Sequence, residues 1–167
     1  MNACSMGWMG ATIVAAVVTL SSCAGVQRRE ATEVSRYCAA RYADPRLAPI
    51  RSRIPIPIAL DAQQPVDLLA DAARPTATER EALRALAQVR AACNDYATKR
   101  FGPPPAYRMR TQDEISLALA RLYSGETTYG QFNRSLLYIS ERNQAAREEL
   151  DRAAKEREAA EWMAVYD

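Results

Sequence analysis

The stretch that decides the fold class is "TYGQFNRSLLYISERNQAAREELDRAAKEREAAEWMAVYD", residues 128–167. After Gly130 it contains no glycine or proline, and mostly small or apolar side chains recur at alternating intervals of three and four residues. The members of this seam are Tyr129, Phe132, Leu136, Ile139, Asn143, Ala146, Leu150, Ala153, Arg157, Ala160 and Ala164. Such spacing places side chains on one face of an α-helix. The sequence therefore predicts one long, heptad-patterned helix over residues 128–167.

The seam changes character at Asn143. Its members before that residue are bulky and should pack in the core, whereas those after it are mostly alanine, with Arg157 at a seam position. We expect the far half of the helix either to project from the body or to pack closely on a partner helix. Leu150, Arg157 and Trp162 are therefore candidate partner-binding residues.

Capping boxes predict the starts of the helices upstream. Thr76-x-x-Glu79 and Thr78-x-x-Glu81 are two alternative starts for a helix that ends before "GPPP" at 102–105. The apolar face of this helix comprises Leu83, Leu86, Val89, Cys93 and Tyr96. A box at Thr111 predicts a short third helix that ends at Ser124. The long last helix has its own box, Thr128-x-x-Gln131.

A proline-rich arm, residues 45–75, separates these helices from an earlier one that ends at Asp44. The arm holds six of the nine prolines and should run extended, because proline lacks the backbone donor that helices need. Ile54, Ile56 and Ile58 make it too apolar for a solvated linker, so we expect it to pack across the helices, with a helical turn at 66–72. The alternative is a strand or polyproline segment that docks on a partner, with Ile54, Ile56 and Ile58 as candidate partner-binding residues.

These patterns predict an all-α fold. It consists of a small helical bundle with a proline-rich extended arm (45–75) and a long C-terminal helix (128–167), within a single helical domain spanning residues 30–167. The length of 167 residues and the mix of 49% apolar and 25% charged residues suit one folded domain.

Composition excludes several classes of function. The chain has no histidine, which excludes Ser-His-Asp and Cys-His catalysis and histidine metal sites. It contains no glycine-rich phosphate-binding motif, and its net charge of +2 does not favour a nucleic-acid partner. We therefore predict no catalytic residue, no metal, no cofactor and no nucleic acid, and expect the protein not to be an enzyme.

The N-terminal residues predict a location. Residues 1–22 carry no charged side chain, and an apolar run ends at Leu20-Ser21-Ser22-Cys23. This tetrad resembles the signal of bacterial lipoproteins. The resemblance implies a signal peptide at 1–22, lipid on Cys23 that attaches the protein to a membrane, and a tether at 23–29. Because alanine and glycine follow the cysteine, it also implies delivery to the outer membrane, facing the periplasm or the cell surface.

Two observations bear on that resemblance. The first ten residues lack lysine and arginine, which signal peptides normally carry, so a buried N-terminal helix of a cytosolic protein is the alternative. In favour of the lipoprotein interpretation, "YADPRLAPIRSRIP", "LADAARPTATEREAL" and "GETTYGQFNR" resemble segments of small uncharacterised lipoproteins of Gram-negative bacteria. That resemblance implies an envelope protein and no particular activity.

The four cysteines divide accordingly. Cys4 leaves with the signal peptide and Cys23 carries lipid, so Cys38 and Cys93 remain as two thiols in an oxidising compartment, where a disulfide is the expected fate. A metal site would need more ligands than two thiols in a chain without histidine, and a redox pair is usually C-x-x-C. We predict a structural Cys38–Cys93 disulfide between two helices.

Together these features predict a lipoprotein that acts as a structural or accessory subunit of a cell-envelope assembly. Its partner, an envelope protein, would bind the far half of the long helix or the proline-rich arm. The alternative is an inhibitor or ligand-binding lipoprotein that captures a periplasmic protein or glycan. Its tyrosines and arginines would form the surface, with an exposed cluster at Tyr107 and Arg110.

Overall fold

The computed structural model describes residues 32–58, 60 and 64–166. The signal peptide, Cys23 and the tether that the sequence predicts lie outside these residues. A helix at 32–42 comes first. It is followed by the 3₁₀ helix η1 (Pro45–Ile50) and by α2 (Val66–Ala70), α3 (Ala77–Phe101), α4 (Ala106–Ser124) and α5 (Tyr129–Tyr166). The described residues contain no strand, which confirms the predicted all-α class.

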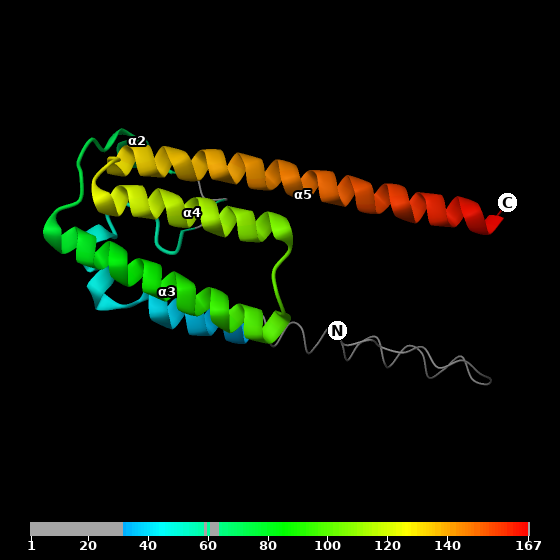
Figure 1. Ribbon diagram of the computed structural model, residues 1–167, viewed down its shortest axis with the longest axis horizontal. Helices are drawn as coiled ribbons and strands as arrows, with labels where there is room; N and C mark the ends of the chain where they lie inside the picture. The colour runs from blue at the N-terminus through cyan, green and yellow to red at the C-terminus, as the bar shows by residue number, and fades with distance from the viewer. Residues whose placement is uncertain (1–31, 59, 61–63, 167) are drawn as a thin grey trace.

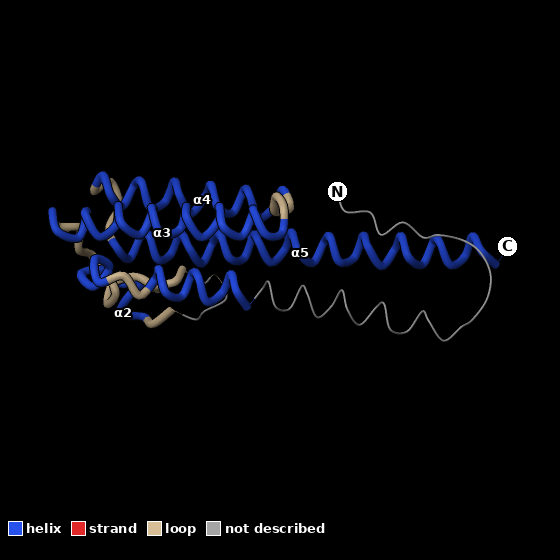
Figure 2. Tube along the Cα trace, turned by 90° about the horizontal axis from the view of Figure 1, so that it is seen from below, coloured by secondary structure: helices blue, strands red, loops and turns tan. Residues whose placement is uncertain are grey.

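The three long helices lie side by side in chain order. Figures 1 and 2 show α3, α4 and α5 running back and forth with nearly parallel axes, and α4 contacts both of its neighbours. The helix at 32–42 lies along the other side of α3, where the ring of Tyr37 stacks on that of Tyr96 with centroids 4.0 Å apart. Past the N-terminal end of α4, α5 continues alone as a straight rod.

Helix α3 begins at the first of the two predicted capping boxes. The Thr76 amide donates to Glu79 Oε2 at 2.8 Å, and the Glu79 amide donates to Thr76 Oγ1 at 3.3 Å. Each bond satisfies a donor that a helix start would otherwise leave unpaired. The helix ends at Gly102, whose φ of 80° lies in a region that side chains disfavour.

The predicted start of the third helix was wrong. Helix α4 begins at Ala106, directly after the prolines, because the Pro105 carbonyl accepts hydrogen bonds from the amides of Arg108 (2.9 Å) and Met109 (3.2 Å). A proline at the helix boundary loses nothing, since the first amides have no partner within the helix. Thr111 lies inside the helix and its hydroxyl donates to the Tyr107 carbonyl at 2.9 Å. The helix therefore has 19 residues and is not short.

The arm packs across the helices as predicted, but it is not extended throughout. Its first six residues form η1, with Asp44 capping the start and Pro45 in the first turn. Leu47 and Ile50 of η1, with Ile54 after it, are at most 1% exposed. The arm thus fills the core between helices: η1 contacts α3, and α2 contacts α5.

The core itself draws on most of these elements. Its fully buried large side chains come from the arm, α3, α4 and the first half of α5: Leu47, Ile50, Ile54, Leu86, Leu122, Tyr129, Phe132, Asn133 and Leu136. Burial of this apolar area stabilises the fold. The seam of α5 contributes Tyr129, Phe132, Leu136 and Ile139, as its bulky half predicts.

The arm caps the start of α5 at close range. The amides of Tyr129 and Gly130 donate to the carbonyls of Ala73 (3.0 Å) and Asp71 (2.7 Å), while Thr128 and Gln131 form the predicted box at 2.8 and 3.2 Å. A Cβ on Gly130 would lie 2.6 Å from the Leu69 carbonyl oxygen. Glycine is therefore required here because any side chain would clash with the arm, and not because of its backbone angles.

Two polar residues hold the arm in register with the helices. The Arg53 guanidinium pairs with Asp71 at 2.9 Å and with the nearly buried Glu79 at 2.8 Å. The buried Asn133 amide donates to the carbonyls of Arg53 and Leu68, each at 2.9 Å. Because Glu79 also closes the α3 capping box, one carboxylate joins the helix start to the arm.

Candidate functional site

The half of α5 beyond Asn143, which we call the projecting half (residues 144–166), has mostly exposed side chains as far as residue 163. Leu150 and Trp162 are 49% and 60% exposed, and Arg157 is also exposed. At the boundary with the packed half, the Thr111 hydroxyl of α4 lies 3.2 Å from Asn143 Oδ1. The seam therefore continues into solvent, as its change in character at Asn143 predicts.

The three arm isoleucines proposed as partner contacts face inward. Ile54 is 1% exposed, and Ile56 and Ile58 are partly buried against the core. A partner could reach Ile54 only by opening the body. The prediction of Ile54 as a partner contact is therefore wrong, because the arm uses its apolar residues to complete the core, which the helices alone do not close.

Tyr107 and Arg110 lie in the first turns of α4, at the end from which α5 projects. Arg110 is exposed and Tyr107 is half-buried. Of the other tyrosines, Tyr129 is in the core and Tyr37 and Tyr96 stack on each other, whereas Tyr138 of α5 is 61% exposed. Three of these four rings thus form a pair or a core contact, which does not favour a common platform for a glycan.

Cys38 and Cys93 are neighbours across the contact between the helix at 32–42 and α3. Both are free thiols in this structure, so the predicted bridge is not formed in it. Burial, together with a hydrogen bond with the Cys38 side chain, raises the pKa of the Cys93 thiol to about 12. At neutral pH Cys93 is thus a protonated, weakly nucleophilic group.

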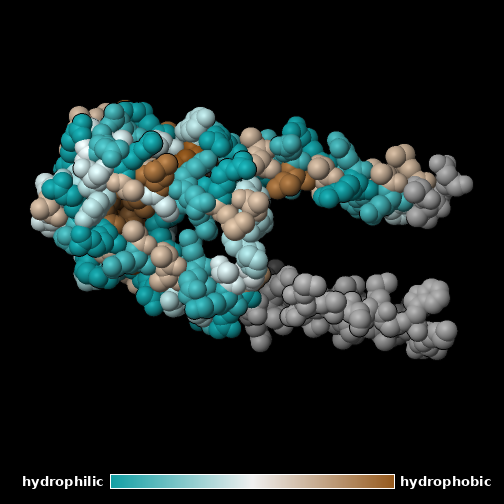
Figure 3. Space-filling view, viewed as in Figure 1, coloured by the Kyte–Doolittle hydropathy of each residue, from teal (hydrophilic) through white to brown (hydrophobic). Residues whose placement is uncertain are grey.

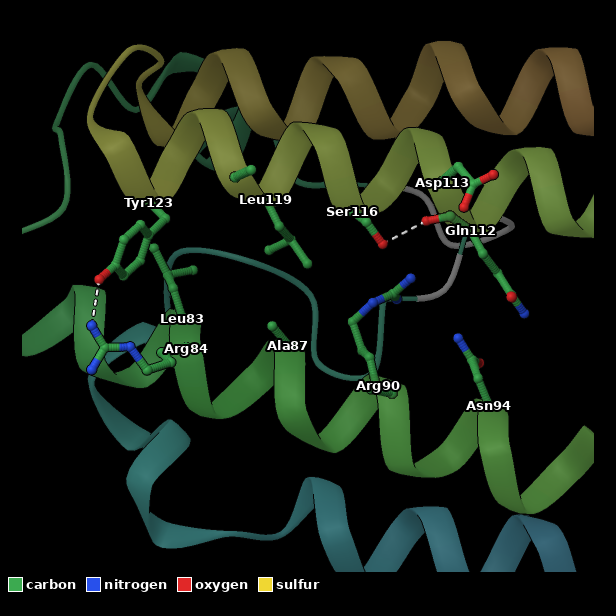
Figure 4. A pocket seen from close by; sticks show the side chains of 12 residues that line it. Leu83, Arg84, Ala87, Arg90, Asn94, Gln112, Asp113, Ser116, Leu119 and Tyr123 are labelled. Atoms are coloured by element: carbon green, nitrogen blue, oxygen red, sulfur yellow. Dashed lines mark hydrogen bonds between the residues drawn. The ribbon is translucent and has the colours of Figure 1, made fainter.

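A groove of about 470 Å³ runs between α3 and α4, and the sequence-based predictions missed it. Two stripes of side chains spaced four, three and four residues apart face each other across it (Figure 4). The stripe on α3 is Leu83, Ala87, Arg90 and Asn94, and that on α4 is Gln112, Ser116, Leu119 and Tyr123. The small side chains of Ala87 and Ser116 do not fill the space between the two helices. The signal that could have revealed it is this pair of stripes, each apolar at one end and polar at the other.

Other kinds of site are not seen in the described part of the chain. No group of three or more cysteine, aspartate or glutamate side chains there is placed to hold a metal ion. Nor does any helix among those residues have both the length and the apolarity needed to cross a membrane.

Comparisons with known proteins add no relative. The chain matches no family model, and no curated protein or solved structure is significantly similar to it.

Proposed function

We propose that this protein is a lipid-anchored accessory subunit of a bacterial cell-envelope assembly. Cys23 would attach it to the outer membrane, facing the periplasm, and the projecting half of α5 would bind another envelope protein. The observation that carries the proposal is the continuation of one helical seam from a buried environment into an exposed one.

The exposed seam supports binding of a helix. Ala146, Ala153 and Ala160 recur every seven residues along the face that is buried in the first half of α5. Small side chains at such positions allow a second helix to approach closely, and Leu150 between them supplies an apolar contact. Only part of the helix packs on the body, so a partner helix would stabilise the rest, whose isolated stability in water is marginal.

Charge defines the partner further. Arg157 stands at a seam position, where a second copy aligned in parallel would place the same charge opposite it. A carboxylate on the facing helix would instead form a charge-assisted pair. We therefore propose a partner helix with large apolar side chains that fit between the alanines and an acidic residue opposite Arg157.

The Cys38–Cys93 bridge belongs to the same proposal. The two thiols are adjacent, and a link between them would join the helix at 32–42, which follows the anchor, to α3. Force transmitted through the lipid anchor would then reach the core through a covalent bond. Mass analysis and alkylation of protein purified without reductant should find no free thiol at either residue. Two alkylated thiols would remove the bridge from the proposal.

Site-specific crosslinking tests the binding surface. A photoreactive amino acid would be placed in living cells at Ala146, Leu150 or Ala153 on the seam, and at Glu148 or Lys155 on other faces as matched controls. We expect one heterologous adduct from the seam positions, weakened by Arg157→Glu. Equal adducts from both sets, or none, would contradict the proposal. An adduct of twice the protein's own mass would assign the surface to self-association.

Fractionation tests the anchor separately. Cys23→Ser should move the protein from the outer-membrane fraction to the soluble one, while Cys4→Ser should leave it in the membrane. Unchanged membrane retention of Cys23→Ser would contradict lipid attachment at that residue, whatever the crosslinking experiment shows.

A further inference from the structure

The α3–α4 groove has an apolar half and a polar half. At one end Leu83, Leu119 and the ring of Tyr123 form the walls, and at the other end Asn94 and Gln112 face each other (Figure 4). On the face shown in Figure 3, apolar side chains are visible in the furrow between these helices. The volume of about 470 Å³ lies within the range of small-molecule sites.

Arg90 stands where the two halves meet. Its side chain points from α3 into the groove toward Ser116, and it is half-buried. Burial lowers the pKa of Arg90, with Tyr42 and Cys93 opposing the shift. Within the described residues, no carboxylate oxygen lies within 4.0 Å of its guanidinium. A cation taken partly out of water without a counter-charge is costly, and an incoming anion would offset that cost.

The neighbouring arginine in the groove shows the contrast. Arg84, at the apolar end, pairs with Glu81 at 3.0 Å and donates to the Tyr123 hydroxyl at 2.6 Å. Its charge is therefore satisfied within the protein. Arg90 is the lining arginine that lacks a carboxylate in the described structure, and the side-chain amides of Asn94 and Gln112 next to it supply further donors.

We propose that this groove binds an alkyl carboxylate, such as a free fatty acid of medium chain length. The carboxylate would pair with Arg90, and the alkyl chain would lie along Ala87 and Leu119 toward Tyr123. An apolar tail fits the half of the groove that has few polar groups. A peptide bound there would have backbone donors and acceptors without partners. Asp113 is exposed at the polar rim, and its carboxylate would repel a ligand that carried a second negative charge.

Calorimetric titration of the chain with sodium decanoate tests the assignment. Wild type should bind, and Arg90→Met should bind about 10- to 100-fold more weakly, because a charge-assisted bond is lost. Arg147→Gln, on the exposed part of α5, removes the same charge elsewhere and should bind as wild type. Decanol should bind wild type and Arg90→Met equally weakly.

Two further measurements separate binding from folding. Arg90→Met should melt at the same temperature as wild type or higher, since it removes an uncompensated charge. Ala87→Phe, at an exposed position of α3, should fill the groove and abolish decanoate binding without lowering the melting temperature. Failure of wild type to bind decanoate at millimolar concentration, or equal affinity of wild type and Arg90→Met, would overturn the proposal. Binding to Ala87→Phe at wild-type affinity would place the ligand elsewhere and overturn it too.

Discussion

The two halves of α5 share one helix and one spacing but differ in what their seam meets. In the packed half (residues 129–143), Tyr129, Phe132 and Leu136 are at most 1% exposed. In the projecting half, Leu150 stands at an equivalent seam position and is 49% exposed. Spacing therefore predicts the helix, whereas the volume of the seam side chains predicts whether the body covers it.

The largest difference should come from removing a leucine in each half. Leu136→Ala leaves a cavity in the core and should lower the free energy of unfolding by about 2–5 kcal/mol. Leu150→Ala removes the same atoms from an exposed site and should change it by less than about 0.5 kcal/mol. Denaturant unfolding followed by circular dichroism measures both. Similar losses in the two variants would show that the projecting half is packed in solution.

Gly130→Ala tests the contact that fixes the start of the packed half. The added Cβ would meet backbone atoms of Leu69 and Asp71, which cannot move aside as a side chain would. We expect a loss of about 1–3 kcal/mol, although alanine is the better helix former. Glu141→Ala, at an exposed position of the same half, is the control and should change stability by less than about 0.5 kcal/mol. A gain in stability would mean that α2 does not lie against α5.

Asn143→Ala probes the boundary between the halves. The single hydrogen of the Thr111 hydroxyl is shared between Asn143 Oδ1 at 3.2 Å and the Tyr107 carbonyl at 2.9 Å, so this change removes the longer of two competing acceptors. The expected loss in the free energy of unfolding is about 0.5 kcal/mol, the low end of the net value of one hydrogen bond, because the hydroxyl keeps its closer acceptor. Thr111→Val should lose a similar amount, and the double variant should lose less than the sum. Full additivity would show that the two side chains do not interact.

Deleting residues 146–167 should have the smallest effect on stability. The shortened protein should melt within a few degrees of the intact one, because the deleted side chains that the structure describes, residues 146–163, fill no part of the core. Thermal unfolding by calorimetry measures this, and the crosslinking partner should be lost. A broad or strongly lowered transition would mean that the projecting half belongs to the cooperative unit.

Much of the fold is encoded locally. Thr76 and Glu79 are three residues apart, so their capping box predicted the start of α3, and Gly125 at the end of α4 has the positive φ of 78° expected of a helix terminator. The Thr111 box failed because Pro105 offered a start earlier in the chain. A motif predicts that a residue can cap a helix, but the competing starts nearby decide whether it does.

The features missed depend on pairs distant in sequence. Asn133 bonds to carbonyls 65 and 80 residues away, and nothing around it in the sequence indicates burial. The same holds for the groove, because Arg90 of α3 and Ser116 of α4 face each other only once the two helices have packed. Likewise, the arm isoleucines were correctly predicted to pack, but only the helix arrangement shows that Ile54 faces the core.

The projecting half of α5 also sets a distance. At 1.5 Å per residue, residues 144–166 form a rod roughly 35 Å long, comparable to the width of a small domain. A partner bound at its tip would be held at that distance from the body, so the length of the helix would act as a ruler that sets the spacing between the body and the partner. Inserting one heptad would lengthen the ruler by about 10 Å while turning its face by only about 20°. Inserting two residues would instead turn the face by roughly 200° while lengthening the rod by only about 3 Å.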